Sequence, residues 1–466
     1  MTEMTTGGMC APHLLNRRQA MQIGVGLFGL NLPQLLQAKQ SDNKESGKQD
    51  ISCIFIFLAG GPSHFETFDP KPDAPAEIRG PWKPIDTNVP GIQICEKLPL
   101  LAQRMDKVAL IRSWQGKSGS HSTGSQHVAS GFKPTGKQYF PNFGCLVSAL
   151  YGSRVPGVPP HLGLPVAARY TDPPGYLGTA YSAFDLKGDP SKPEMELGGL
   201  NLSQVRFENR LEMLSQLENL SRLQEIQNSQ FESVDKFTDE AIAMLTSGAM
   251  QKAVNLEEEP IQTRERYGDN IYGRRVLLAR RLVEAGARFV TINQAVQGGL
   301  FGNAKTNGTW DNHGWLFDSM MTFSKPPADL PKGKRWHSYA GPGNVPQLDM
   351  SLSALLDDLD ERGLLDTTLV VAMGEFGRTP KINATAGRDH YPNAGSVLMA
   401  GGPVQRGTVI GATDRKGSLP STRPWRPEDF ATSIYHALGI DAHQTYFPRL
   451  ARPTPIAAGE LIEGLF

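Results

Sequence analysis

Four segments that lie far apart in the sequence carry clusters of imidazole and carboxylate side chains. The clusters hold His64, Glu66 and Asp69; Asp311 and His313; Glu375; and Asp389 with His390. Imidazoles and carboxylates together suit Zn²⁺, Mn²⁺ or another divalent first-row ion, while Ca²⁺ and Mg²⁺ also accept the carboxylates. Each cluster alone is a weak signal. Together they indicate one divalent metal site, provided that the fold brings them to a common point.

Most of these clusters also have an ordinary interpretation. Asp69 precedes Pro70, a dipeptide that suits a turn. Asp311, in the segment WDNHG, would cap a turn, and residues 388–390 would form a solvated loop network. Glu375 stands between glycines in GEFG and has no evident packing purpose. The sequence alone leaves both interpretations open, namely metal ligation and an ordinary role in a turn or loop.

Three of the four clusters directly follow segments with the pattern of strands. Residues 51–58 read ISCIFIFL and residues 368–373 read TLVVAM, which are continuous apolar runs of strand length. Further strand candidates are residues 108–111, 288–293 and 396–399. Catalytic and binding groups gather where parallel strands leave a sheet. We therefore expect the clusters to converge at one sheet edge.

Helical patterns separate these strands. In residues 347–362 leucines recur at spacings of three and four, and Gly363 ends the helix. Further helices are expected at residues 202–250, at residues 272–285 and after Arg426, whereas residues 156–193 are expected to be irregular. The alternation predicts an α/β fold with a mostly parallel central sheet covered by helices on both faces. We assign residues 51–466 to this one domain, with a helical excursion at about 202–285.

The first forty residues have the composition of an export leader. Asn16, Arg17 and Arg18 precede an uncharged, mildly apolar stretch at residues 20–36, a pattern typical of twin-arginine leaders. The stretch is too short and too rich in glycine for a stable transmembrane span. We expect a leader at residues 1–40, a linker at 41–50, the twin-arginine export machinery as a partner, and a periplasmic or extracytoplasmic location. An amphipathic N-terminal helix is the alternative.

Net charge narrows the possible partners, and cysteine content narrows the possible cross-links and metal sites. The formal net charge of the 466 residues is zero, so neither a nucleic acid nor an anionic membrane surface is expected as the main partner. After Cys10 in the leader, the chain has Cys53, Cys95 and Cys145, with no CxxC pair. A disulfide framework or a zinc–thiolate site is therefore not expected.

Several motifs together resemble a known family. They are AGGPSHFETFDPKPD, WDNHG, LLDDLDERGLLDTTLVVAMGEFGRTP and GRDHYP. In combination they resemble domain-of-unknown-function family 1501, over nearly all of residues 51–450, and that family in turn resembles the alkaline phosphatase and sulfatase superfamily. Leu364, Leu365, Asp366 and Thr368 fit the superfamily's helix-to-strand motif. Glu375 and Phe376 stand where its Asp and His would be.

The resemblance implies roles for individual residues. Asp311 and His313 would be an Asp/His metal pair, His390 a late ligand, and Glu66 or Asp69 the ligand after the first strand. The nucleophile would lie at a helix start, with Ser122 the first choice and Thr123 the next. Arg378, three residues after Glu375, would hold a non-bridging oxygen of the substrate, or else form a structural salt bridge.

Two functions are consistent with these observations. The first is an exported metal-dependent hydrolase acting on a phosphate or sulfate ester of a small molecule or glycan. The sequence contains no Cys-x-Pro-x-Arg or Ser-x-Pro-x-Arg motif, which disfavours a formylglycine sulfatase. The second is a catalytically silent exported module that retains the fold and binds an envelope or glycan partner.

Overall fold

The computed structural model describes residues 50–135, 140–164, 174–190, 243, 248–294, 309–314, 316–321, 343–445 and 454–466. The chain divides into two compact units, Met1–Lys48 and Gln49–Phe466, and the fold below is that of the second. The expected leader and residues 202–242 of the expected helical excursion lie outside the described residues. Among the helices that are described, none has both the length and the apolar character needed to cross a membrane.

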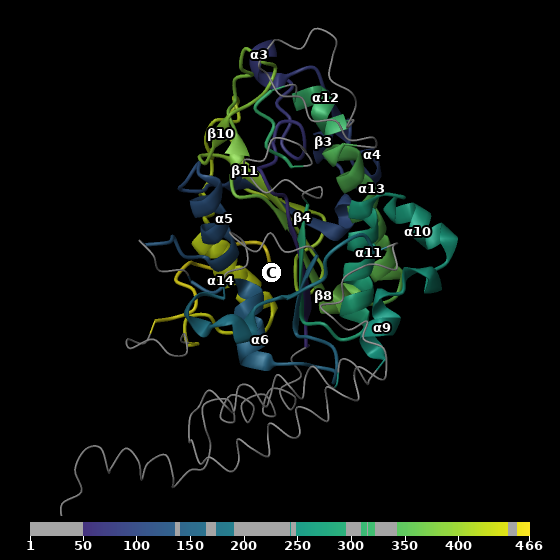
Figure 1. The fold of residues 1–466 in the computed structure, drawn as a ribbon. Coiled ribbons are helices and arrows are strands. Elements are labelled where there is room, and N and C mark those ends of the chain that lie inside the picture. Colours follow the sequence, from purple (N-terminus) through teal and green to yellow (C-terminus); the bar gives the residue numbers. More distant parts are fainter. Residues whose placement is uncertain are drawn as a thin grey trace, which may run out of the picture. The chain divides into compact units, whose positions relative to one another are not determined.

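An eight-stranded sheet runs through the second unit (Figure 1). Its strand order is β12-β4-β11-β8-β1-β7-β5-β6. The strands are β1 (Ser52–Phe57), β4 (Val108–Trp114), β5 (His161–Leu164), β6 (Phe184–Asp185), β7 (Phe289–Asn293), β8 (Thr368–Met373), β11 (Gly395–Ala400) and β12 (Thr408–Ile410). Neighbouring strands pair in parallel except at β11, which is antiparallel to β4 and β8. The predicted α/β class with a mostly parallel sheet is confirmed.

Strand β1 explains why the sheet must be covered on both faces. All six of its residues are buried, and successive side chains of a strand point to opposite faces. Phe55 and Phe57 join one apolar cluster, whereas Ile54 and Ile56 join the other. A strand that is apolar on both faces is stable only between two layers.

Helices form these two layers (Figure 1). One face carries α4 (Pro99–Ala102), α9 (Ala249–Val254), α10 (Ile261–Tyr267), α11 (Ile271–Glu284), α12 (Leu316–Met321) and α13 (Asn344–Glu361). The other face carries α5 (His121–Ser130), α6 (Phe143–Tyr151) and α14 (Pro427–Ala437). The helices expected at residues 272–285 and 347–362 are thus present as α11 and α13.

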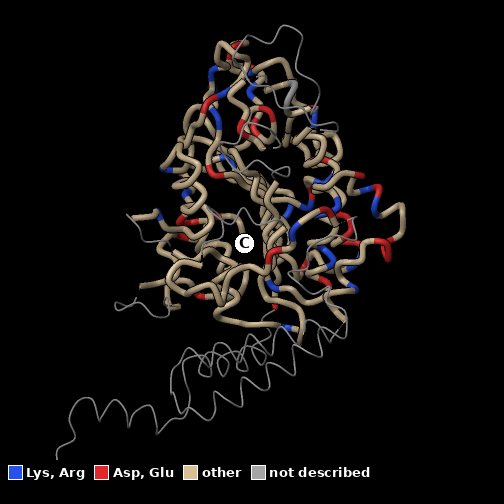
Figure 2. The backbone as a smooth tube through the Cα atoms, viewed as in Figure 1, with Lys and Arg blue, Asp and Glu red and all other residues tan. Residues whose placement is uncertain are grey.

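Short elements complete the described fold. They are α3 (Ala76–Arg79), the antiparallel pair β2 (Pro84–Asp86) and β3 (Gln93–Cys95), the antiparallel pair β9 (Gly377–Arg378) and β10 (His390–Tyr391), and 3₁₀ turns at Met105–Lys107, Gly175–Leu177, Thr179–Tyr181, Leu256–Glu258 and Leu365–Thr367. Charged residues of both signs are interspersed along the described chain, with many on α10, α11 and α13 (Figure 2).

One expectation about the fold is wrong. Residues 156–193 were expected to be irregular, yet they contain β5 and β6, and β5 pairs in parallel with β7 inside the sheet. The sequence of β5 is His-Leu-Gly-Leu, which lacks the continuous apolar run that identifies β1 and β8. His161 is buried within β5, and a Cβ on Gly144 of α6 would lie 2.2 Å from its ring. Tertiary packing, rather than a local pattern, makes this segment a strand.

Candidate metal centre

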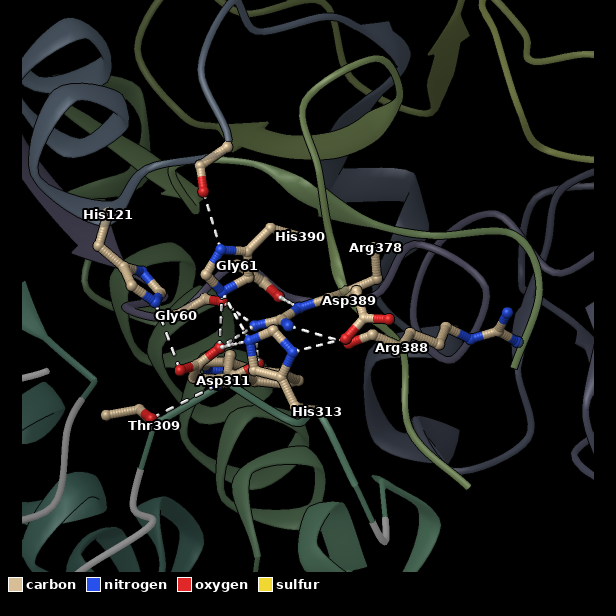
Figure 3. Close-up of polar contacts among 12 residues, drawn as sticks. Gly60, Gly61, His121, Thr309, Asp311, His313, Arg378, Arg388, Asp389 and His390 are labelled. Atoms are coloured by element: carbon tan, nitrogen blue, oxygen red, sulfur yellow. Dashed lines mark hydrogen bonds and ion pairs between the residues drawn. The ribbon is translucent and has the colours of Figure 1, made fainter. Parts of the chain in front are cut away.

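Four connections bring imidazole and carboxylate groups to one edge of the sheet (Figure 3). His121 is the first residue of α5, which follows β4, and Glu375 follows β8 directly. Asp311 and His313 lie after β7, and His390 lies in β10, just before β11. Because β11 is antiparallel to β8 and β4, the beginning of β11 lies at the same edge as the ends of those strands.

Asp311, His313 and His390 point toward one another at this edge (Figure 3). Asp311 Oδ1 lies 2.9 Å from His390 Nε2 and 3.1 Å from His313 Nε2, and the two Nε2 atoms are 2.9 Å apart. Two atoms that each bind one ion at about 2.1 Å lie about 3.0 Å apart when they subtend 90° at the ion. The three atoms therefore have the mutual spacing of ligands that share one face of a coordination sphere.

His121 contributes a further imidazole from the opposite side of the Asp311 carboxylate. Its Nε2 is 3.3 Å from Asp311 Oδ2. Ligand atoms of His121, Asp311 and His390 all lie within 4.8 Å of one another, a grouping that could hold a metal ion. The four side chains are between 17% and 46% exposed, so a small solute can reach the group.

The second nitrogen of each imidazole is held by an acceptor. His121 Nδ1 is 2.7 Å from Glu375 Oε1, His313 Nδ1 is 2.7 Å from Asp389 Oδ1, and His390 Nδ1 is 2.8 Å from the Gly119 carbonyl oxygen. A carboxylate or carbonyl oxygen only accepts, so each Nδ1 donates and each neutral ring has a lone pair at Nε2. Metal-bound histidines typically have such a partner, which fixes the tautomer and the ring orientation.

This arrangement favours added positive charge between the side chains, either as protons or as a metal ion. With three Nε2 lone pairs facing one carboxylate, only added protons or a metal ion would remove the repulsion. Burial alone would lower the pKa of His121, but its hydrogen bonds with Asp311 and Glu375 raise it to about 9. Burial alone would raise the pKa of Asp311, but the three imidazoles and Arg378 hold it well below its usual range. The donor set therefore fits a divalent first-row ion.

Two glycines allow the loop after β1 to pass beside Asp311. Gly60 and Gly61 have φ values of +110° and +80°, which glycine adopts without strain. A Cβ on Gly60 would lie 2.4 Å from the Asp311 backbone nitrogen, and a Cβ on Gly61 would lie 2.4 Å from the Phe376 ring. Gly60 N also donates to Glu375, at 3.0 Å from Oε1.

Three expected ligands lie in other hydrogen-bonding networks. Glu66 accepts from Arg388 through both oxygens, at 2.6 Å from Nη2 and 3.0 Å from Nε. Asp69 accepts from Lys71 at 2.9 Å and from the Thr413 hydroxyl.

His64 Nε2 lies 2.9 Å from the Gly417 carbonyl oxygen, and burial lowers the pKa of this imidazole to about 4. These three side chains hydrogen-bond with Gly417, Arg388, Lys71 and Thr413 rather than with the proposed ligands. We therefore leave His64, Glu66 and Asp69 out of the proposed ligand set.

Two further expected ligands, Glu375 and Asp389, contact the Nδ1 atoms of histidines rather than the space between the Nε2 atoms. Arg378, expected to hold a substrate oxygen or to form a structural salt bridge, is fully buried and donates to protein acceptors. Its ion pair with Asp311, 2.8 Å from Nη2 to Oδ1, agrees with the alternative of a structural salt bridge.

Ser122 and Thr123, the expected nucleophiles, lie in the first turn of α5 beside His121. The Ser122 hydroxyl is 3.3 Å from the Ser120 hydroxyl. The sequence pattern pointed to a hydroxyl nucleophile in this segment and did not single out His121. The signal was present, because His121 follows the strand predicted at residues 108–111, as other clusters follow predicted strands.

The family of the chain follows from a match over the whole second unit. The model of the family described as "Protein of unknown function (DUF1501)" matches residues 50–466. The chain belongs to this family. A comparison with curated proteins gives no match.

Solved structures with similarity to the chain have low identity and low TM-scores. One is the lipoteichoic acid synthase LtaP from Listeria monocytogenes, with 10% identity, a TM-score of 0.37, and coverage of 88% of this chain and 75% of that one. A protein of the alkaline phosphatase superfamily from Vibrio parahaemolyticus has 10% identity, a TM-score of 0.35, and coverage of 85% and 68%. A phosphonate monoester hydrolase from Silicibacter pomeroyi has 12% identity, a TM-score of 0.35, and coverage of 84% and 73%.

Proposed function

We propose that this protein is an exported hydrolase that uses one divalent metal ion to cleave a phosphate or sulfate ester of a small molecule or glycan. The observation that carries the proposal is the convergence of three imidazole Nε2 atoms on the Asp311 carboxylate, with every Nδ1 held by an acceptor. A site of this kind is suited to a Lewis acid and has no evident purpose in packing. Zn²⁺ or Mn²⁺ is favoured by the nitrogen donors.

Each residue has a defined role in this proposal. Asp311, His313 and His390 hold the ion, which when bound would polarise an oxygen of the ester group. His121 lies on the other side of the carboxylate, as a fourth ligand or as a group that faces the substrate. Glu375 and Asp389 orient the rings of His121 and His313 through the hydrogen bonds to Nδ1.

Helix α5 supports the binding of an anionic ester. Its N-terminus lies at the site, because His121 is its first residue, and the N-terminal end of a helix favours negative charge. Ser122 and Thr123, in the same turn, are the candidate nucleophiles within the proposal.

Metal content and ester hydrolysis of purified full-length variants test the proposal. The wild-type protein should contain at least one equivalent of transition metal and should hydrolyse p-nitrophenyl phosphate, bis-p-nitrophenyl phosphate or p-nitrophenyl sulfate. H313A and H390A should lose the metal and lower hydrolysis by at least about 100-fold, because each removes one ligand. H443A, which removes an exposed histidine outside the site, is the control and should retain both.

A protein that contains no metal and turns over none of these esters would refute the hydrolase. A second candidate function is the silent exported module that binds an envelope or glycan partner. It is favoured by Phe376, whose ring packs against His390 with centroids 4.2 Å apart, at the position where the resembled superfamily has a histidine. Bound metal without turnover would select this second function.

A further inference from the structure

Arg378 is buried at the point where the segments of the candidate metal centre meet. Its residue exposure is 0%, and it lies in β9, where it pairs with His390 of β10. A guanidinium in such a place requires a hydrogen-bond acceptor for nearly every N–H group, because burying a charge without partners is costly.

The acceptors of Arg378 come from three separate segments. In the loop after β1, Nε donates to Gly61 O at 2.9 Å and Nη2 donates to Gly60 O. In the segment after β7, Nη2 donates to Trp310 O at 3.0 Å and to Asp311 Oδ1 at 2.8 Å. In the loop before β10, Nη1 donates to Arg388 O at 3.0 Å. One side chain thus joins the backbone on either side of the site to the proposed ligand itself.

We propose that Arg378 is the positioning residue of the metal centre. It fixes the Asp311 carboxylate and its flanking backbone relative to His390, and so sets the spacing of the proposed ligand atoms. The role depends on the planar fork of the guanidinium, because its donors point in several fixed directions at once, which an ammonium group cannot reproduce. This inference rests on the proposed function, since it assumes that the centre binds a metal ion.

The decisive experiment compares metal affinity in two lysine variants of buried arginines. R378K keeps the positive charge but replaces the planar guanidinium group with an ammonium group. R280K is the matched control, because Arg280 is also fully buried and pairs with Glu259 and Asp358 at 2.8 Å each, among helices away from the site. Mn²⁺ binding to the full chain is measured by the electron paramagnetic resonance of free Mn²⁺, below the melting temperature of each variant.

R378K should bind Mn²⁺ about 10- to 100-fold more weakly than wild type, the range found when partners of metal ligands are changed. R280K should melt at a lower temperature and bind Mn²⁺ as wild type does. If R378K binds Mn²⁺ with wild-type affinity, the inference about Arg378 is overturned but the proposed metal centre is not. If the wild-type protein binds no Mn²⁺, both are overturned.

Hydrogen exchange in the wild-type protein gives a second test that does not depend on the folding of R378K. Adding Zn²⁺ should slow amide exchange at residues 60–61, 310–311 and 388, which the guanidinium links, and should leave α11 unchanged. Unchanged exchange at all three segments, with Zn²⁺ bound, would also overturn the inference.

Discussion

The Nδ1 contacts of His121, His313 and His390 give each ring one orientation and one tautomer. Glu375 and Asp389 therefore influence the site without facing its centre. Their carboxylates lie behind the rings, where they favour the charged imidazolium when no metal is present and make the neutral ring a better electron donor when a metal is bound.

The raised pKa of His121 predicts that the metal-free protein loses stability at alkaline pH. Its pKa is about 9 in the folded chain, compared with the ordinary value of 6.5. A raised pKa means that the protonated form stabilises the fold below pH 6.5, and that this contribution is lost as the pH rises from 6.5 to about 9. The melting temperature of chelator-treated protein should fall over that window.

The variant H121N should show a weaker pH dependence of the melting temperature between pH 6.5 and 9. H436N, which removes an exposed histidine, should behave as wild type. If H121N and wild type show equal slopes, His121 does not titrate as its contacts predict.

At the scale of single residues, the sequence predicted the residue types of the site better than the role of each residue. It singled out Asp311, His313, Asp389 and His390, and the structure brings these four together. It could not separate the residues that face the centre from those that orient them, because that difference depends on side-chain direction. It placed His64, Glu66 and Asp69 at the site because strand ends usually converge. In the structure, Gly60, directly after β1, is the residue that contacts Asp311 and Glu375.

At the scale of elements, the contact between α5 and α14 is set by a glycine. Gly131 ends α5 with a φ of +76°, and a Cβ there would lie 2.4 Å from the Cβ of Ala431 in α14. Gly439, after α14, has the same φ of +76°, but a Cβ there would meet nothing within 4 Å. The two positions share the backbone strain and differ only in the helix contact.

Alanine at these two glycines should therefore have unequal effects. G439A should lower the free energy of unfolding by about 1 kcal/mol, the cost of a left-handed backbone for alanine. G131A should lower it by a further 1–3 kcal/mol or so, because α5 must move away from α14. Urea unfolding of both variants measures the difference, and equal losses would show that the two helices separate without cost.

Elements with a strong local pattern were predictable, whereas strand direction was not. The apolar runs of β1 and β8, the leucine spacing of α13 and the end of that helix at Gly363 agree with the structure. The antiparallel direction of β11 has no local signal, since it follows from the path of residues 374–394 back to the same sheet edge. The membership of β5 in the sheet likewise depends on its neighbours.

At the scale of the whole molecule, the division into two units predicts that the second unit functions alone. Residues 49–466 should melt at the same temperature as the full chain and should bind the same amount of Mn²⁺, because the described fold and the candidate metal centre lie within the second unit. A lower melting temperature without residues 1–48 would show that the two units depend on each other.

Residues 1–50 fused to a reporter should direct its export, and changing Arg17 and Arg18 to lysine should stop it.

The antiparallel placement of β11 beside β8 also bears on the order of folding. These strands are neighbours in the sheet and only 21 residues apart along the chain, and the connection between them carries Glu375, Arg378, Asp389 and His390. Contacts that are local in sequence form at a smaller entropic cost than distant ones. We expect this half of the centre to form early and to acquire Asp311 and His121 only when β7 and β4 join the sheet, so that a metal ion would bind late and commit the chain to its native state.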